Sequence, residues 1–402
     1  MTRKGTATIA FVAHLKHQRR LFDVIARALP GDIQTRLFFV RRDEIRTRLY
    51  DLLHKNRGAS SDIIDRVAEY DGLRGSLGLE DAEAQQVRAR IRKHAAYCYE
   101  LFLRKLAGVD LLVVWNGYKL PESCAVAAAK EIGASTIHCE NGPLPGTLTM
   151  DPAGINFAGS LTGKPAGFYE SIDMDREKAN LMSHIELQQR PLRKAGNGEL
   201  TQFDQQALPE RYAFFAMQVH DDSQVLLFSP RFRTMESVVP YVAERVAAYN
   251  SRTGDTLRLV VKEHPSDFGR VDYSAMQSMH PEVLFLRARP VRDLIDGARA
   301  VITLNSTVGI EALLRLRPVI TLGDAFYNVP GLVRHVEPNE DLADVLGATI
   351  DRPINEALAE RFLYFMRYEY LVPVAKDNAD RASVEPAVQR IMDVLQGRLS
   401  WT

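Results

Sequence analysis

Short apolar runs alternate with amphipathic stretches along the first half of the chain. Apolar runs of strand length lie at 6–14, 35–40, 111–116 and 135–141. Amphipathic stretches of helix length lie between them, at 19–29, 82–106 and 122–133. Strands separated by such helices are typical of a parallel sheet with crossover connections. The first half is therefore predicted to form an α/β domain.

The same alternation restarts in the second half. The strands predicted there lie at 212–219, 225–230, 257–265, 283–288, 301–306 and 318–323, and a helical tail follows at 354–372 and 386–396. The polar stretch 194–210 has the composition of a linker. We expect an α/β fold of the GT-B type, with two doubly wound Rossmann-type domains facing across a cleft. The predicted domains are an N-terminal domain at 1–195, a second α/β domain at 196–350, and C-terminal helices at 351–402 that cross back to the N-terminal domain.

Composition narrows the class of protein. The 402 residues are 46% hydrophobic and 25% charged, which suits a soluble chain with two packed cores. Lys plus Arg and Asp plus Glu both total 51, so nucleic acid is not an expected partner. No apolar run approaches the roughly 20 residues of a membrane span, and the N-terminus turns polar too early for a signal peptide. A cytoplasmic location is expected, with reduced cysteines at 98, 124 and 139.

The stretch LNSTVGIEALL, which begins at Leu304, joins an apolar strand to a helix. Ligands of open α/β sheets bind at such strand ends, and Asn305, Ser306 and Thr307 with the helix N–H groups would bind a phosphate. Glu311 lies one turn further on, where a carboxylate would accept the hydroxyls of a ribose. By itself the turn fits ordinary helix capping better, because these residue types cap helices constantly.

Two more polar clusters follow predicted strands. In KEHPSDFG, Pro265 stops the strand and leaves His264 at the rim of the sheet, where it would donate to a departing phosphate. In QVHDDSQ, His220, Asp221 and Asp222 lie between two predicted strands. A turn in which an Asp side chain bonds to its own backbone and a functional cluster are equally favoured there.

Together these segments resemble the capsule polysaccharide biosynthesis family, and within it the bacterial retaining β-Kdo glycosyltransferases. The resemblance rests on QVHDDSQ, EHPSD, TLNSTVGIEALL, LGDAFYNVPGL and ENGPLPGTLTMDPAGIN, which cover roughly residues 110 to 335. It implies CMP-Kdo as donor, retention at the anomeric carbon, and a lipid-linked or polysaccharide acceptor. No cofactor is implied besides this donor substrate.

The resemblance also implies roles for individual residues. Asp222 matches the acidic position of the family pattern and is the expected nucleophile at C2 of Kdo, since retention needs two inversions or a shielded face. Glu140 is the expected acceptor base, although relatives often carry a second acid where this chain has Asn141. Expected donor-binding residues are Gln218, Ser223, Lys262, His264, Asn305, Ser306, Thr307 and Glu311; expected acceptor-binding residues are Asn116, Glu140 and Asn141.

No metal is expected, because backbone N–H groups and His264 can meet the charge of a single phosphate. Asp173 and Asp175 imitate a metal-binding DxD, but acidic residues suit the start of the predicted helix that follows them. A charged face such as that of the helix around Arg88 is usually just solvated, and weak peripheral contact with the cytoplasmic face of the inner membrane is the alternative. Capsule assembly proteins are expected partners there.

Two other functions stay open. A nucleotide-sugar epimerase or hydrolase has the same expected architecture. A non-catalytic member that binds nucleotide or glycan in a capsule assembly complex is the second. The sequence does not specify the acceptor, the linkage, the number of Kdo residues added or the oligomeric state.

Overall fold

The computed structural model describes residues 6–39, 60–182, 206–374 and 379–402, and it divides into two compact units. The first unit combines Met1–Ser160 with Tyr368–Thr402, and the second is Leu161–Arg367. The predicted boundary at 195 lies outside the described residues. The units differ from the predicted domains in that residues 161–182 pack with the second unit and the chain returns to the first at Tyr368 rather than at 351.

Aromatic packing explains where the second unit begins and ends. Helix α15 (Glu356–Phe365) contacts both α6 (Ala166–Glu170) and α7 (Arg176–Met182). The ring of Phe168 lies 5.2 Å from that of Phe365, and the ring of Tyr169 lies 5.1 Å from that of Phe362. These edge-on contacts hold α15 in the second unit. The predicted return of the tail to the N-terminal domain is thus limited to residues 368–402.

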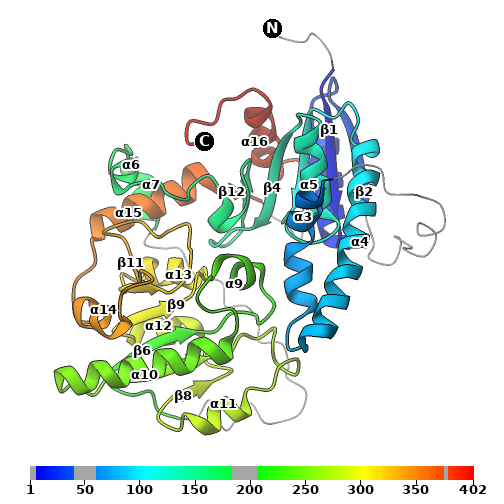
Figure 1. Ribbon diagram of the computed structural model, residues 1–402. Coiled ribbons are helices and arrows are strands. Elements are labelled where there is room, and N and C mark those ends of the chain that lie inside the picture. The colour runs from blue at the N-terminus through cyan, green and yellow to red at the C-terminus, as the bar shows by residue number, and fades with distance from the viewer. Residues whose placement is uncertain (1–5, 40–59, 183–205, 375–378) are drawn as a thin grey trace. The chain divides into compact units, whose positions relative to one another are not determined.

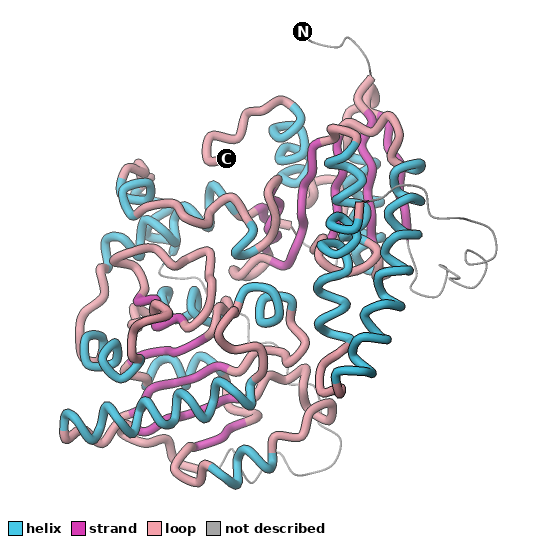
Figure 2. Tube along the Cα trace, in the orientation of Figure 1, coloured by secondary structure: helices cyan, strands magenta, loops and turns pink. Residues whose placement is uncertain are grey.

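The first unit contains a six-stranded sheet (Figures 1 and 2). Its strands are β1 (Thr8–Ala13), β2 (Gln34–Phe39), β3 (Leu111–Trp115), β4 (Ser135–Asn141), β5 (Thr147–Asp151) and β12 (Val372–Pro373). They lie in the order β12-β5-β4-β3-β1-β2, and the four strands β1 to β4 are parallel as predicted. β5 and β12 add an antiparallel edge that was not predicted.

Both faces of this sheet are covered. Side chains of α1 (Lys16–Ala28) and α16 (Glu385–Leu395) form a buried cluster with Ile9 and Phe11 of β1. The alternate residues Ala10 and Val12 point to the other face and join a cluster with three further helices, α3 (Ser61–Gly75), α4 (Asp81–Lys105) and α5 (Glu122–Glu131). Burial on both faces explains why the central strands β1 and β3 are almost wholly apolar.

The second unit contains a parallel sheet of six strands. These are β6 (Tyr212–Ala216), β7 (Arg258–Lys262), β8 (Leu284–Leu286), β9 (Ala300–Thr303), β10 (Val319–Thr321) and β11 (Arg334–His335), in the order β11-β10-β9-β6-β7-β8. Numbered along the chain, the order from one edge is 3-2-1-4-5-6, which is that of dinucleotide-binding sheets. The helices of this unit besides α6, α7 and α15 are α9 (Ser223–Phe228), α10 (Met235–Thr253), α11 (Ser274–Met279), α12 (Val291–Gly297), α13 (Val308–Leu314) and α14 (Leu342–Thr349). The predicted α/β class with two parallel-rich sheets is confirmed.

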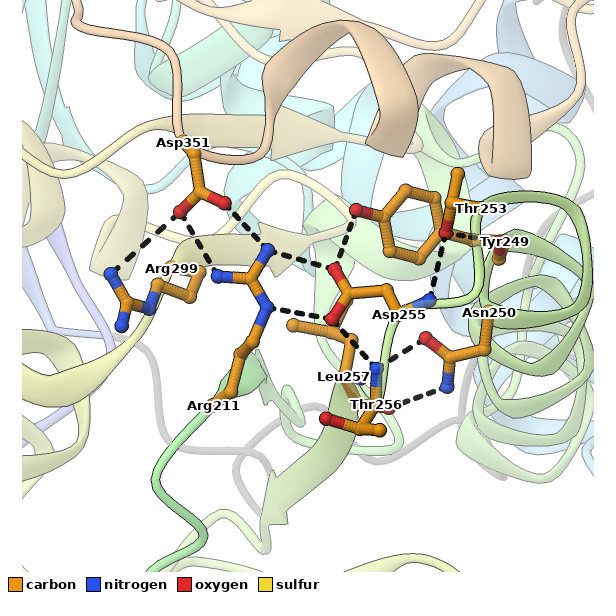
Figure 3. A network of polar contacts seen from close by, with 9 residues as sticks. All are labelled: Arg211, Tyr249, Asn250, Thr253, Asp255, Thr256, Leu257, Arg299 and Asp351. Atoms are coloured by element: carbon orange, nitrogen blue, oxygen red, sulfur yellow. Dashed lines mark hydrogen bonds and ion pairs between the residues drawn. The ribbon is translucent and has the colours of Figure 1, made fainter.

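An ionic network fixes the amino end of β6 (Figure 3). Arg211 donates from Nε and Nη2 to the two carboxylate oxygens of Asp255, each at 2.7 Å, and also pairs with Asp351. The Tyr249 hydroxyl donates to the same Asp255 carboxylate at 2.7 Å. These bonds hold the pKa of Asp255 well below its usual range, chiefly through Arg211. The network anchors the end of the strand that lies away from the loops described below.

One predicted strand is wrong. Residues 225–230 were predicted to extend, but 223–228 form the short helix α9. The apolar run VLLF is too brief for its periodicity to separate helix from strand. Asp222 decides the outcome locally, because its side chain caps the helix by accepting the N–H of Gln224.

None of the helices within the described ranges has the length and hydropathy that a membrane span requires.

Candidate functional site

The sheet of the second unit reverses its order between β6 and β9. In such sheets, ligands bind outside the carboxyl ends of the two strands that flank the reversal. β6 ends at Ala216 and leads into QVHDDSQ, and β9 ends at Thr303 and leads into LNST. Two of the motifs singled out in the sequence therefore meet at the position where the topology places a ligand.

Gln218 and Asn305 join these two loops directly. Gln218 Nε2 donates to Asn305 Oδ1 at 2.9 Å, and Asn305 N donates back to Gln218 Oε1 at 3.1 Å. Asn305 Nδ2 spends both of its hydrogens on the carbonyl oxygens of Gln224 (2.9 Å) and Phe228 (3.0 Å), at the two ends of α9. Both side chains are buried. Both residues are predicted to bind the donor. In the structure, their side chains bond to each other, and Asn305 also bonds to α9.

Asp222 begins α9 and lies in the loop after β6. Its Oδ1 accepts Gln224 N at 2.9 Å, and its own N–H bonds to the carbonyl of Val219 at 3.0 Å. The side chain is half-buried, and the neighbouring predicted residue Ser223 is buried. Two hydrogen bonds connect Asp222 to the β9 loop through Gln224. The Gln224 N–H donates to Asp222, and the Gln224 carbonyl accepts a hydrogen bond from Asn305 Nδ2. The acidic side chain is therefore held in one place relative to the LNST turn.

The turn before α13 is shaped by hydroxyl groups. Ser306 N donates to Thr303 Oγ1 at 3.2 Å, and Val308 N donates to Ser306 Oγ at 3.2 Å. Thr307 is the N-cap residue, and its side chain makes no capping bond. Glu311 lies on the first turn of the helix and is half-buried. The turn keeps the hydroxyls of Ser306 and Thr307 at its half-exposed rim, where a phosphate was predicted.

Tyr327 buttresses the same turn, and the predicted site did not include it. Its hydroxyl donates to the carbonyl of Ser306, and its ring is fully buried. A Cβ on Gly309 would lie 2.5 Å from the Tyr327 hydroxyl, so only glycine fits the first turn of α13 here. Tyr327 belongs to LGDAFYNVPGL. This motif therefore contributes a buried side chain that supports the predicted phosphate turn through the Ser306 carbonyl.

His264 and Lys262 lie at the carboxyl end of β7, next to β6. His264 Nδ1 accepts the N–H of Ser266 at 3.1 Å, so the neutral ring carries its proton on Nε2 and presents a donor there. Lys262 ends the strand and is buried. Asp267, which lies in the loop that follows β7, is also buried and accepts hydrogen bonds from His220.

The predicted acceptor residues of the first unit lie at the ends of β3 and β4. Asn116 Nδ2 donates to Glu140 Oε2 at 3.2 Å, and Glu140 Oε1 accepts the N–H of Asn141 at 2.8 Å. Asn116 has a φ of 63°, and a Cβ on Gly117 would lie 2.5 Å from His138 Nδ1. The left-handed turn therefore needs Asn and Gly in these places and brings two of the three predicted residues together, while Asn141 is exposed.

Glu122 was not predicted as a functional residue, yet it is a buried carboxyl near the point where the order of the first sheet reverses, between β1 and β3. Its Oε1 lies 3.9 Å from Nδ1 of His14, which directly follows β1, and its Oε2 has no hydrogen-bond partner among the described residues. Burial raises the pKa of Glu122 to about 8, and the negative charge of Asp71 adds to the shift. No sequence pattern carries this signal, because a Glu in the first turn of a helix is ordinarily exposed.

The Glu122→Gln variant is expected to stabilise the protein in alkaline solution. Between the unfolded pKa of about 4.3 and the folded pKa of about 8, the folded chain keeps a proton that the unfolded chain has released. Stability is therefore lost as pH rises through this window, and Gln removes the loss, with a gain on the order of 5 kcal/mol at full ionisation. Denaturant unfolding of both proteins at about pH 5 and about pH 9 measures the difference. Glu131→Gln, at the exposed end of the same helix, is the control, and an equal effect of Glu122→Gln at both pH values would contradict the assignment.

Two other predicted features have structural explanations within the described residues. Asp175, the second Asp of the DxD-like sequence, accepts the N–H of Lys178 on Oδ1 at 3.0 Å and so caps α7. In the basic helix α4, Arg88 donates to the Ser76 hydroxyl of α3 and Arg92 pairs with Asp65. These two arginines bind the neighbouring helix. Membrane contact by the remainder of α4 stays a prediction.

The geometry defines a class: an α/β protein of two Rossmann-type units, with a polar site at the order reversal of its second sheet. Comparison with known proteins then shows similarity to one family. Residues 185–358 match the model of a family described as "Capsule polysaccharide biosynthesis protein". The resemblance to the capsule polysaccharide biosynthesis family is confirmed over this stretch, which includes the β6, β7 and β9 loops.

The chain is also similar to individual curated proteins. Protein FixF of Sinorhizobium fredii is 35% identical over 264 residues, which are 65% of this chain and 60% of that protein. The capsule polysaccharide export protein KpsS of Escherichia coli is 31% identical over 132 residues, 31% of this chain and 33% of that protein. The chain thus spans less than two thirds of the curated relatives it matches.

Solved structures were also compared. The β-Kdo 2,4 transferase of Thermosulfurimonas dismutans KpsC is 18% identical, with a TM-score of 0.45 over 71% of this chain and 88% of that chain. Its β-Kdo 2,7 transferase is 17% identical, with a TM-score of 0.42 over 74% of this chain and 88% of that chain. At these scores the fold description rests on the sheet topology given above.

Proposed function

We propose that the protein is a retaining glycosyltransferase that transfers Kdo from CMP-Kdo to a lipid-linked or polysaccharide acceptor in capsule biosynthesis. The observation that carries the proposal is the hydrogen-bonded path from Asp222 through Gln224 and Asn305 to the LNST turn. It holds a carboxylate and a phosphate-binding turn in fixed relation at the order reversal of the sheet. That pair of groups is what a double displacement on a sugar phosphate requires.

In the first chemical step, an oxygen of Asp222 attacks C2 of Kdo. The bond from C2 to the phosphate oxygen breaks, and its electron pair leaves with CMP. His264 donates from Nε2 to that phosphate, and the hydroxyls of Ser306 and Thr307 bind its other oxygens. Glu311 accepts the ribose hydroxyls, and Ser223 and Lys262 complete the donor-binding side. The second step releases Asp222 when the acceptor hydroxyl attacks C2, so two inversions give retention.

The acceptor side is assigned to the first unit. Glu140, oriented by Asn116, offers carboxylate oxygens to acceptor hydroxyls, with Asn141 at the exposed rim. An epimerase or hydrolase would use the same nucleotide contacts without an acceptor. We place the reaction in the cytoplasm, at the membrane face where a lipid-linked acceptor and capsule assembly proteins are present.

Mass spectrometry of CMP-Kdo reactions, with and without a panel of lipid and glycan acceptors, tests this function. The expected result is acceptor-dependent release of CMP together with an acceptor heavier by one or more Kdo units. Conversion of the donor at the same rate without acceptor would favour the epimerase or hydrolase. Binding of CMP without any conversion would favour the non-catalytic alternative.

Transfer is expected to survive excess EDTA. Because a nucleoside monophosphate donor leaves with a single phosphate, backbone N–H groups, hydroxyls and His264 suffice to meet its charge. The measurement is the initial rate of CMP release after dialysis against EDTA, with and without added Mg²⁺. Loss of activity that Mg²⁺ restores would show that the proposed phosphate site is incomplete.

A further inference from the structure

His220 forms a pair with the buried Asp267 in the loop that carries Asp222, and the proposed function gives the two residues no role so far. His220 Nδ1 lies 2.9 Å from Asp267 Oδ1, and the His220 N–H donates to Asp267 Oδ2 at 3.0 Å. The Asp267 side chain is 1% exposed, whereas that of His220 is 27% exposed. A buried carboxylate thus holds a partly exposed imidazole by both its ring and its backbone.

Further contacts fix the Asp267 carboxylate. The Tyr273 hydroxyl donates to its Oδ2 at 3.2 Å, and Arg270 Nη1 lies 3.8 Å from its Oδ1. Arg270 also pairs with Asp221 at 3.0 Å, and Asp221 lies 4.0 Å from His220 Nδ1. The imidazole therefore has two carboxylates on its Nδ1 side. Arg270 shares both of these carboxylates with the ring.

The two histidines of this site are held in opposite tautomers. His264 Nδ1 accepts a backbone N–H, so its Nε2 is a donor. His220 Nδ1 faces a carboxylate, so it carries the proton, and Nε2 of the neutral ring has a lone pair. One ring is arranged to give a hydrogen bond or a proton, and the other to take one. Such a division between neighbouring loops is what acid and base roles in one reaction require.

We propose that His220 Nε2 is the base that takes the proton of the acceptor hydroxyl, with Asp267 as its positioning residue. This inference rests on the proposed function. In the second step, the acceptor oxygen forms a bond to C2 of Kdo, and the bond from C2 to the Asp222 oxygen breaks. Its electron pair returns to the Asp222 carboxylate, the hydroxyl proton passes to Nε2, and Asp267 stabilises the imidazolium until the proton leaves to water.

Position favours His220 over Glu140 for this role. His220 lies two residues before the proposed nucleophile, in the same loop and on the same unit. Both Glu140 oxygens already accept hydrogen bonds from Asn116 and Asn141, which suits a group that orients an acceptor. We therefore assign acceptor binding to Glu140 and proton transfer to His220.

His220→Asn tests the proposal, because Asn can keep the hydrogen bond to Asp267 but has no group in place of Nε2. The reaction is separated into its halves. Intact-protein mass spectrometry without acceptor measures the Kdo adduct, and CMP release with acceptor measures transfer. The variant is expected to form the adduct as the unaltered protein does and to transfer about 100-fold more slowly. Azide, a nucleophile that needs no base, is expected to restore turnover as a Kdo azide.

Two comparisons complete the experiment. His280→Asn removes a histidine that faces Glu282 at 3.0 Å on the same unit, and it should leave every rate unchanged. Asp267→Asn should slow transfer and respond to azide in the same way, because it disturbs the orientation and charge of the base. Normal transfer by His220→Asn, loss of its adduct, or slow transfer that azide does not restore would each overturn the proposal. Failure of the unaltered protein to form an adduct or release CMP would instead reject the proposed function.

Discussion

Asp222→Asn is expected to lower the rate of transfer by at least about 10³-fold, while CMP still binds. The amide cannot attack C2 of Kdo, but its oxygen can still accept the N–H of Gln224, and Asn caps helices as well as Asp does. The loss of activity is therefore separated from any loss of structure. The measurement is acceptor-dependent CMP release, alongside calorimetric binding of CMP.

Asp341→Asn is the matched control for this variant. Asp341 is another half-exposed Asp that caps a helix of the second unit, by accepting the N–H of Ala343 at 3.0 Å. Its replacement removes a negative charge from an N-cap without touching the proposed site, so transfer should continue. If Asp222→Asn transfers Kdo as fast as this control, Asp222 is not the nucleophile.

Asn305→Asp is expected to destabilise the second unit by about 3 kcal/mol or more. The change adds no atoms, but it replaces two N–H donors by an oxygen that faces the carbonyls of Gln224 and Phe228, formerly bonded at 2.9 Å and 3.0 Å. It also buries a negative charge, because Asn305 is 6% exposed. Denaturant unfolding followed by circular dichroism measures the loss.

The control for Asn305→Asp is Asn355→Asp. Asn355 is an exposed N-cap whose side chain accepts the N–H of Leu358 at 3.1 Å, a role that a carboxylate performs equally well. Its unfolding midpoint should therefore not fall. If both variants are equally stable, the hydrogen bonds of Asn305 do not hold α9 to the β9 loop.

The parallel cores were predictable because their signal is local. Apolar runs such as those of β1 and β7 alternate with amphipathic helices, and burial on both faces of a sheet leaves that pattern in the sequence. Other elements had no such signal. β12 is a pair of residues that extends only because β5 lies beside it, and α9 depends on a cap and on a side chain about 80 residues away. A long-range partner decides the first case, and a local cap together with a long-range partner decides the second.

The candidate site divides in the same way. That His264, Ser306 and Asp222 follow strands could be predicted, because proline, the Asp-Asp-Ser turn and a helix start are marked in the sequence. The pairing of Gln218 with Asn305 could not, since residue type does not reveal which amide a side chain will meet. The same is true of Glu122, whose raised pKa comes from burial alone, and of His220, whose tautomer depends on Asp267.

The interrupted first unit has a consequence for how the chain acquires its structure during synthesis. β12 and α16 complete a sheet whose other strands precede residue 160, and Arg390 of α16 donates to the carbonyls of Met150 and Tyr370. A ribosome releases these pieces only after the whole of 161–367. The second unit can therefore fold on the growing chain while the β5 edge of the first sheet still lacks its partner strand β12. A chain interrupted before residue 368 would leave this edge exposed, so the first unit is completed only when residues 368–402 have been made.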